Sequence, residues 1–215
     1  MILYTYFRSS AAYRARLALH LKGIKFESRY VHLLRDGGEQ LSAEYKRLNP
    51  LGRVPTLVDD ELVLTQSGAI MEYLEERYPG PPIMPEAAGD RAFVRSIAQT
   101  LVADTQPLQN LGVARYLSRE MQQSQEAINV WTRHWMSNGF AAVEALLVRR
   151  GACGEFCCGD RPSIADICIV AQCFTTRRFN LALDPYPNVA RIDARCRELA
   201  AFRAAAPAAQ ADFEA

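Results

Sequence analysis

A proline-rich stretch, "YPGPPIMPEAAGD" at residues 78 to 90, divides this 215-residue chain into two parts with different periodicities. Its four prolines and two glycines favour turns and interrupt both helices and strands. Before it, short alternating apolar segments take turns with helical patterns, whereas every periodic segment after it is helical. We therefore predict an α/β domain at residues 1–80 and an all-helical domain at residues 90–208.

The first part follows the order strand, helix, strand, helix, strand, strand, helix. Aliphatic and aromatic residues favour the strands, and apolar residues three or four positions apart favour the helices. We predict strands at residues 2–6, 25–33, 56–59 and 62–65, and helices from Ser10 to Leu21, before Pro50, and from Ser67 to about Tyr78. This order is typical of a small mixed sheet covered by helices.

In the second part, "IADICIVAQCF" is apolar on nearly all faces, which predicts a helix at the centre of a bundle. Ser163 and Asp166 precede it with the spacing of a capping box. We interpret both residues as structural.

Composition limits the classes of function. A net charge of +1 does not favour nucleic acid or an anionic membrane as a partner. No signal peptide is visible, and no apolar run approaches the roughly 18 to 20 residues of a membrane span. The six cysteines, including Cys153, Cys157 and Cys158, lack the spacing of metal ligands. We expect a cytoplasmic protein with reduced thiols and no metal.

Ser9 and Ser10 stand where the first strand gives way to the first helix, in "YFRSSAAYRARLALHLKG". A serine there can cap the helix, which is worth about 1 kcal/mol. Alternatively, a hydroxyl and a helix N-terminus can together stabilise an anion, including a thiolate. This stretch alone leaves both interpretations open.

Two further stretches have equally ordinary explanations when taken singly. In "NPLGRVPTL", Val54 and Pro55 enter a strand, where proline is permitted and its peptide bond can be cis. In "LTQSGAIMEYLEE", Gln66 and Ser67 stand at another helix start.

Together with "DGGEQ", "QPLQNLGV" and "GDRPSIADICIVAQ", these stretches resemble the glutathione transferases over nearly the whole chain, and most closely the zeta class. The resemblance implies an α/β thioredoxin-like domain followed by an all-α bundle. It also implies glutathione as the cofactor and a homodimer.

The resemblance gives Ser9 the role of donating a hydrogen bond to the glutathione sulfur, with Ser10 and Ala11 lining the same helix start. The class usually has a cysteine at the position of Ala11. Any role of that thiol in the rate or in redox sensitivity therefore does not carry over to this chain, whereas the serine mechanism does not need it. The remaining glutathione contacts implied by the resemblance are Gln40, Val54, Pro55, Gln66, Ser67, Gln106 and Asn110.

The implied activity is a cis–trans isomerisation of maleylacetoacetate to fumarylacetoacetate by reversible addition of a thiolate to the double bond. The substrate is a dicarboxylate, and we expect Arg8 and Arg178 to hold it. Arg177 is either part of that site or solvated. Arg14 and Arg16 face solvent or brace the fold.

Other functions compete with this one. A maleylpyruvate isomerase, or a transferase or dehalogenase of small halogenated acids, would use the same thiolate. A thiol–disulfide reductase would need a cysteine where Ser9 and Ser10 stand, and none is present. A binding module without activity would have no need of Ser9, Gln66 and Ser67.

Overall fold

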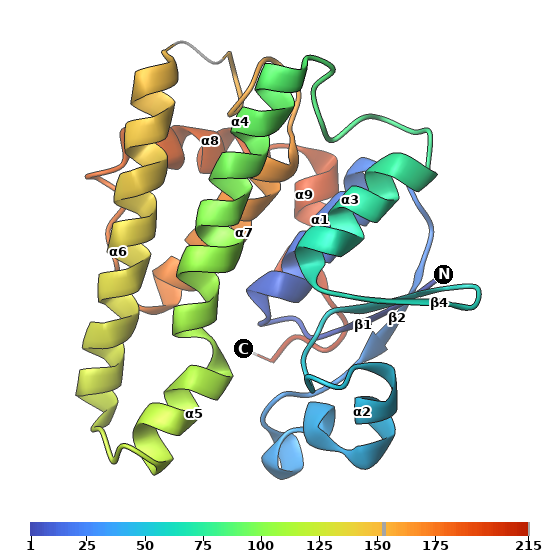
Figure 1. The fold of residues 1–215 in the computed structure, drawn as a ribbon, viewed down its shortest axis with the longest axis vertical. Coiled ribbons are helices and arrows are strands. Elements are labelled where there is room, and N and C mark those ends of the chain that lie inside the picture. The colour runs from blue at the N-terminus through green and yellow to red at the C-terminus, as the bar shows by residue number, and fades with distance from the viewer. Residues whose placement is uncertain (152–153, 215) are drawn as a thin grey trace. The chain divides into compact units, whose positions relative to one another are not determined.

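The computed structural model describes residues 1–151 and 154–214 (Figure 1). The chain forms two compact units, Met1–Ile83 with Glu198–Ala215 and Met84–Arg197. The division differs from the expected helical domain of 90–208 at its C-terminal end. There, helix α9 (Ala200–Ala205) packs against helix α1 (Ser10–Leu21) of the first unit.

The first unit has a four-stranded mixed sheet with the order β2-β1-β3-β4. Strand β1 (Ile2–Thr5) runs parallel to β2 (Glu27–Tyr30) and antiparallel to β3 (Thr56–Asp59), which forms a hairpin with β4 (Leu62–Thr65). The helices are α1, α2 (Ala43–Leu48), α3 (Ser67–Arg77) and, from the C-terminal end of the chain, α9. The predicted order of elements and the thioredoxin-like fold are confirmed.

Helix α1 is buried along nearly its whole length, because α3 and α9 both pack against it. Its buried residues include two arginines, Arg14 and Arg16, which are 1% and 0% exposed. The expectation that they face solvent is therefore wrong, and the alternative that they brace the fold remains.

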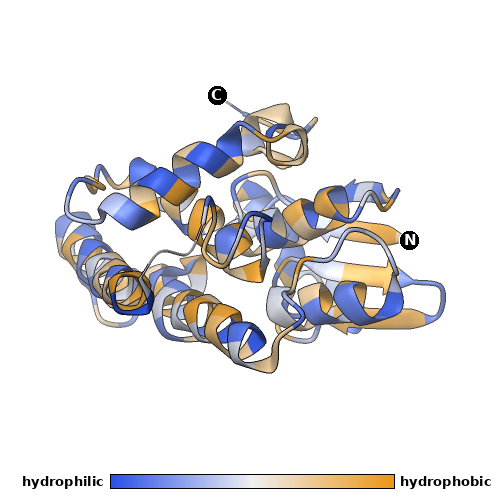
Figure 2. Cartoon of the chain, turned by 90° about the horizontal axis from the view of Figure 1, so that it is seen from above, coloured by the Kyte–Doolittle hydropathy of each residue, from blue (hydrophilic) through white to orange (hydrophobic). Residues whose placement is uncertain are grey.

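The helices of Figure 2 show alternating hydrophilic and hydrophobic bands, as helices with one buried face do.

Arg16 connects the end of β1 to α9. Its Nε donates to the carbonyl of Ala205 at 3.1 Å, and its terminal nitrogens donate to Thr5 Oγ1 and to the carbonyls of Tyr6 and Phe7. Burial lowers the pKa of Arg16 to about 10. The guanidinium thus fixes the segment that leads from the sheet into α1.

The second unit is helical. Its helices are α4 (Ala88–Gln99), α5 (Leu111–Arg119), α6 (Gln125–Arg150), α7 (Ile164–Arg178) and α8 (Pro187–Arg197). A π-helical turn (Thr100–Thr105) and a 3-10 turn (Gln106–Gln109) join α4 to the start of α5. Helix α7 packs against both α4 and α8 and is buried from Ile164 to Cys173, which confirms the predicted central helix.

The predicted capping box begins α7. Asp166 accepts hydrogen bonds from the backbone and hydroxyl of Ser163, each at 2.7 Å, and from the Cys157 backbone at 2.8 Å. Burial raises the pKa of this carboxyl despite those bonds. Its partners are groups of α7 and of the preceding loop, so Asp166 is structural, as interpreted.

Candidate functional site

Ser9 is the N-cap of α1, and its Oγ accepts a hydrogen bond from the Ala12 backbone at 3.2 Å. The capping interpretation is therefore confirmed. A serine hydroxyl can accept and donate at once, so the cap leaves the hydroxyl proton available for an anion. The two interpretations of Ser9 are compatible. Ser10 and Ala11 follow at the same helix start, buried and half-buried.

The Val54–Pro55 peptide bond is cis and lies directly before β3. The Val54 side chain packs in a buried cluster with Phe7 and Ala12, so the loop lies beside the start of α1. Within the described part of the chain, no hydrogen bond reaches the Val54 backbone. That backbone can therefore pair with an extended ligand.

Two residues outside the predicted site, Tyr45 and Asn49, hold this loop. The Tyr45 hydroxyl and the Asn49 amide both donate to the carbonyl of Arg53, at 2.8 and 2.7 Å. Burial raises the pKa of Tyr45 to about 12, so its hydroxyl stays a donor at neutral pH. Asn49 precedes Pro50, and this turn-forming pair was the only visible signal for its role.

Gln66 and Ser67 begin helix α3. Gln66 has φ 67° and ψ 116°, a left-handed conformation that costs a non-glycine residue about 1–3 kcal/mol and is found mainly at functional sites. The buried Ser67 Oγ accepts from Nε of Arg14 at 2.9 Å. As with Ser9, the hydroxyl proton stays available, here beside a guanidinium and a helix N-terminus. This pattern suits a carboxylate.

Gln40 is 4% exposed, and its Nε2 donates to the Leu33 carbonyl at 3.4 Å. Its Oε1 is buried and has no hydrogen-bond partner among the described residues. A buried acceptor of this kind needs a donor. Glutathione carries amide and ammonium N–H groups that could supply one, and its carboxylates match the start of α3. The residues of the first unit fit this cofactor.

Arg8 is half-buried, and its guanidinium lies 5.1 Å from the centre of the Phe7 ring. It immediately precedes Ser9, so a cation and the candidate hydroxyl share one turn. This arrangement suits a site that must hold an anion next to a thiolate.

The other predicted site residues belong to the helical unit. Gln106 is half-buried and begins a 3-10 turn. Asn110 caps α5, with its Oδ1 accepting from Val113 and its Nδ2 donating to the Pro107 carbonyl. Arg178 is exposed at the end of α7. Their roles toward glutathione or substrate stay predictions.

Arg177, beside Arg178, forms an ion pair with the buried Asp193, as does Arg197. Arg177 is also exposed, with 42% of its side chain accessible, so the solvated alternative agrees with the structure. The pair fixes the end of α7 to α8.

The described residues form neither a metal-binding cluster nor a membrane-spanning helix. Residues 1–151 and 154–214 contain no cluster of histidine, cysteine, aspartate or glutamate suited to a metal ion. Helices of the length and apolarity needed to cross a bilayer are also absent from these ranges. Among residues 1–151 and 154–214, no disulfide joins two of the described cysteines, Cys157, Cys158, Cys168, Cys173 and Cys196. Cys153 lies outside the described residues.

A thioredoxin-like unit with a cis proline before β3 and serines at two helix starts, joined to a helical unit, defines the class of the glutathione transferases. In agreement, the family model described as "Glutathione S-transferase, N-terminal domain" matches residues 1–76. The chain belongs to the zeta class of this family, as comparison with individual proteins shows.

Among these is a protein of Vibrio cholerae named "Probable maleylacetoacetate isomerase". It is 47% identical over 212 residues, which cover 99% of this chain and 98% of that protein. A holo structure of a maleylpyruvate isomerase, described as a bacterial zeta-class glutathione transferase, has a TM-score of 0.96 at 43% identity over all of both chains. A maleylacetoacetate isomerase from Methylobacterium extorquens, solved with malonate and glutathione bound, has a TM-score of 0.96 at 36% identity, also over all of both chains.

Proposed function

We propose that this chain is a glutathione-dependent cis–trans isomerase that converts maleylacetoacetate to fumarylacetoacetate. The observation that carries the proposal is the geometry of Ser9. Its hydroxyl caps α1 as an acceptor and keeps its proton for a neighbouring anion. The 47% identity to a protein named for this activity supports the choice of reaction.

Bound glutathione would supply a thiolate that adds reversibly to the conjugated double bond, which then rotates as a single bond. A free thiol has a pKa of about 8.5 and is mostly protonated at neutral pH, so the protein must favour the thiolate. Ser9 donates a hydrogen bond to the sulfur, and the positive end of α1 adds to this effect. Gln66 and Ser67 hold the γ-glutamyl end, and the Val54 backbone pairs with the cysteinyl part.

Cations must hold the substrate carboxylates and the charge that develops on the carbonyl oxygen. The position of Arg8 directly before Ser9 supports this role for it. Arg178 is the second candidate, and the resemblance gives Gln106 a role in binding as well. The malonate bound with glutathione in the Methylobacterium extorquens protein supports a dicarboxylate as the substrate.

Maleylpyruvate is the second candidate substrate, because a maleylpyruvate isomerase of Ralstonia is 43% identical over 99% of both chains. The two substrates differ only in the group on the distal ketone. Loss of absorbance of each, with and without glutathione, separates the candidates. We expect turnover of maleylacetoacetate that depends on glutathione. Turnover of neither substrate would contradict the proposal.

The role of Ser9 has its own test. Ser9→Ala removes the N-cap of α1, which should cost about 1 kcal/mol of stability, and also the donor to the sulfur. Loss of that donor should raise the pKa of bound glutathione and reduce kcat with little loss of glutathione affinity. Thiolate absorbance against pH measures that pKa. If Ser9 served only as a cap, the substitution would cost about 1 kcal/mol of stability and leave turnover intact. Coincident titration curves with equal turnover would exclude the activating role.

We also propose a homodimer in the cytoplasm. Exposed apolar side chains on the edge strand β4, Leu62 and Val63, support an interface there, since they are 43% and 41% exposed. The lack of a disulfide between any two of the described cysteines supports a reducing compartment. A molar mass of one chain in light scattering would contradict the dimer.

A further inference from the structure

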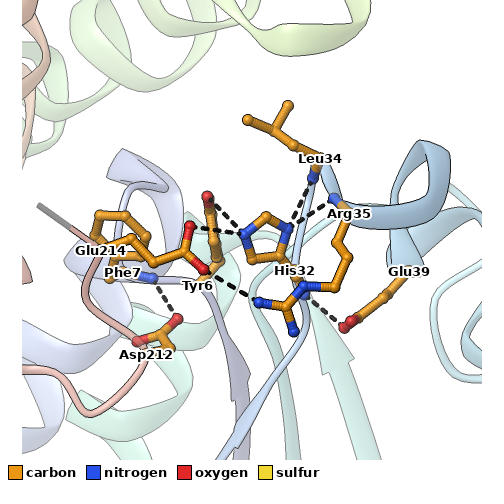
Figure 3. Close-up of polar contacts among 8 residues, drawn as sticks. All are labelled: Tyr6, Phe7, His32, Leu34, Arg35, Glu39, Asp212 and Glu214. Atoms are coloured by element: carbon orange, nitrogen blue, oxygen red, sulfur yellow. Dashed lines mark hydrogen bonds and ion pairs between the residues drawn. The ribbon is translucent and has the colours of Figure 1, made fainter.

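The C-terminal segment lies on the turn between β1 and α1, within the first unit. Figure 3 shows the contact: the backbone N–H of Phe7 donates to Oδ2 of Asp212 at 2.9 Å. The Phe213 ring meets the Phe7 ring edge-on, with centroids 5.4 Å apart. One residue of the turn is thus held by both its backbone and its side chain.

Phe7 is in turn tied to the two residues proposed for chemistry. The Arg8 guanidinium lies over the Phe7 ring, and the Ser9 backbone N–H donates to the Tyr6 carbonyl at 3.1 Å, closing the turn around Phe7. Phe7 is only 2% exposed and packs in the buried cluster with Ala12 and Val54. A displacement of Phe7 would therefore move both Arg8 and Ser9.

A second contact fixes the end of the segment. Glu214 pairs with Arg35 at 3.1 Å and lies 3.4 Å from His32 Nε2. His32 Nδ1 accepts from the backbones of Leu34 and Arg35, so the neutral ring carries its proton on Nε2, which faces Glu214 (Figure 3). These carboxylate contacts are exposed and contribute less than the Asp212 bond.

From this arrangement we infer that Asp212 and Phe213 are positioning residues for the reaction: by holding Phe7, they set the positions of Ser9 and Arg8. The inference rests on the proposed function of those two residues. Asp212 acts through the Phe7 N–H.

The test compares Asp212→Ala, which removes the acceptor, with Asp212→Asn, which keeps an acceptor oxygen but loses the charge. Both remove a carboxylate that favours the charged form of Arg16, so both should lower the melting temperature. Only the alanine variant should raise the pKa of bound glutathione, by roughly half a unit or more, and lower kcat/KM roughly tenfold or more. Glu61→Ala, which removes an exposed carboxylate of the β3–β4 turn, is the control.

Phe213→Ala is the second variant, because Phe213 is 44% exposed and its loss should leave the unit folded. It frees one side of the Phe7 ring, so KM for the dicarboxylate should rise several-fold with the melting temperature unchanged. If the C-terminal segment only stabilised the fold, kcat/KM would fall in proportion to the loss of melting temperature in all three variants.

The inference would be overturned if Asp212→Asn and Asp212→Ala gave the same kcat/KM and the same pKa of bound glutathione as each other. It would also be overturned if both variants gave the wild-type values. A wild-type protein that turns over neither maleyl substrate would overturn the proposed function instead. The thiolate titration of the glutathione complex would then still decide the positioning role, because it requires no substrate.

Discussion

At the scale of single residues, two hydroxyls of the site serve the fold as acceptors and keep their protons for a ligand. Ser9 accepts from the backbone of its own helix, and Ser67 accepts from the buried Arg14. Each oxygen is fixed by a donor that the protein supplies, so its remaining proton points in a restricted direction. A hydroxyl positioned in advance loses little rotational freedom when it binds an anion.

Ser67→Ala should weaken glutathione binding by about 1.5–3 kcal/mol, because it removes a hydrogen bond to a carboxylate. It should also lower stability, since a buried bond from Arg14 is lost. Calorimetric titration gives the affinity, with Ser67→Thr as the control that keeps the hydroxyl. Unchanged affinity in the alanine variant would place the γ-glutamyl anchor elsewhere.

Asp59 offers a prediction on pH. Partial burial acts to raise the pKa of its carboxyl, but hydrogen bonds from the hydroxyls of Tyr78 and Tyr73 outweigh burial and lower the pKa below 3.8. A lowered carboxyl pKa contributes stability that is present above the unfolded value and is lost as pH falls through the folded value. The double variant Tyr73→Phe/Tyr78→Phe should therefore be less stable than wild type near neutral pH.

That difference should shrink as pH falls below about 3.8, because the protonated carboxyl gains less from the two donors. Urea unfolding at a series of pH values measures it. A stability difference that stays constant down to the lowest pH would contradict the assignment of these bonds to the charged form of Asp59.

At the scale of helices and strands, local patterns were enough to predict most elements. Strand β1, helix α1 and the capping box of α7 depend on neighbours within a few positions, and all three are confirmed. Contacts between residues far apart in the sequence could not be predicted in this way. Nothing in the residues around Arg16 or Phe7 indicates that Ala205 and Asp212, about 200 positions away, are their partners.

The same limit applies to the candidate site. Ser9, Val54 and Ser67 were found because the family resemblance gives each a role. It gives no such role to Arg14, Tyr45 or Asn49, although Arg14 and Asn49 lie within the motif stretches. Arg14 was hardest to find, since a charged residue on a helix is ordinarily exposed. Its burial follows from α3 packing against α1.

The packing of the π-helical turn before Gln106 against α6 gives a prediction on stability. Thr105 ends this turn, is 1% exposed, and donates to the Thr100 carbonyl at 2.7 Å. It packs against Gly139 of α6, where an added Cβ would lie 2.1 Å from Thr105 Oγ1. Gly139→Ala should therefore cost about 1–3 kcal/mol, because neither helix can easily move.

The compensating change is Thr105→Ala in the same chain, which removes the clashing atom. A double-mutant cycle by urea unfolding should recover part of the loss in the double variant. Strictly additive costs would show that the close packing of Thr105 on Gly139 does not fix the turn.

At the scale of the whole molecule, the first unit is built from both ends of the sequence. Phe202 and Ala205 of α9 are buried against it, and Arg16 donates to the Ala205 carbonyl. The expected boundary at residue 208 followed the helical pattern, which cannot tell which unit a helix joins. The short, alanine-rich α9 belongs to the α/β unit because α1 covers its apolar face.

A chain that ends at Arg197 should lose at least about 3 kcal/mol from the first unit, through the exposed face of α1 and the lost Arg16 bond. Trp131 and Trp135 both lie in α6, so tryptophan fluorescence reports unfolding of the helical unit alone. Glutathione titration reports on the first unit. We expect binding to fail while the tryptophan transition persists.

A chain that ends at Ala209 is the control, because it keeps α9 and lacks only the segment that holds Phe7. It should bind glutathione more tightly than the shorter chain. If both truncated chains bind as well as the full chain, α9 contributes nothing to the first unit.

The split first unit also has a consequence for the order of events during translation. The helical unit is one continuous stretch, so it can complete its core while the ribosome still holds the residues that follow. Residues 1–83 leave the ribosome first but wait for roughly 120 more residues, about 6–24 seconds at ordinary rates of synthesis, before α9 emerges. Throughout that interval the nascent chain lacks α9 on the face of α1 that it covers, and Arg16 lacks the Ala205 carbonyl. The part of the protein made first is therefore the last to be finished, and that interval is when chaperones and proteases have access to it.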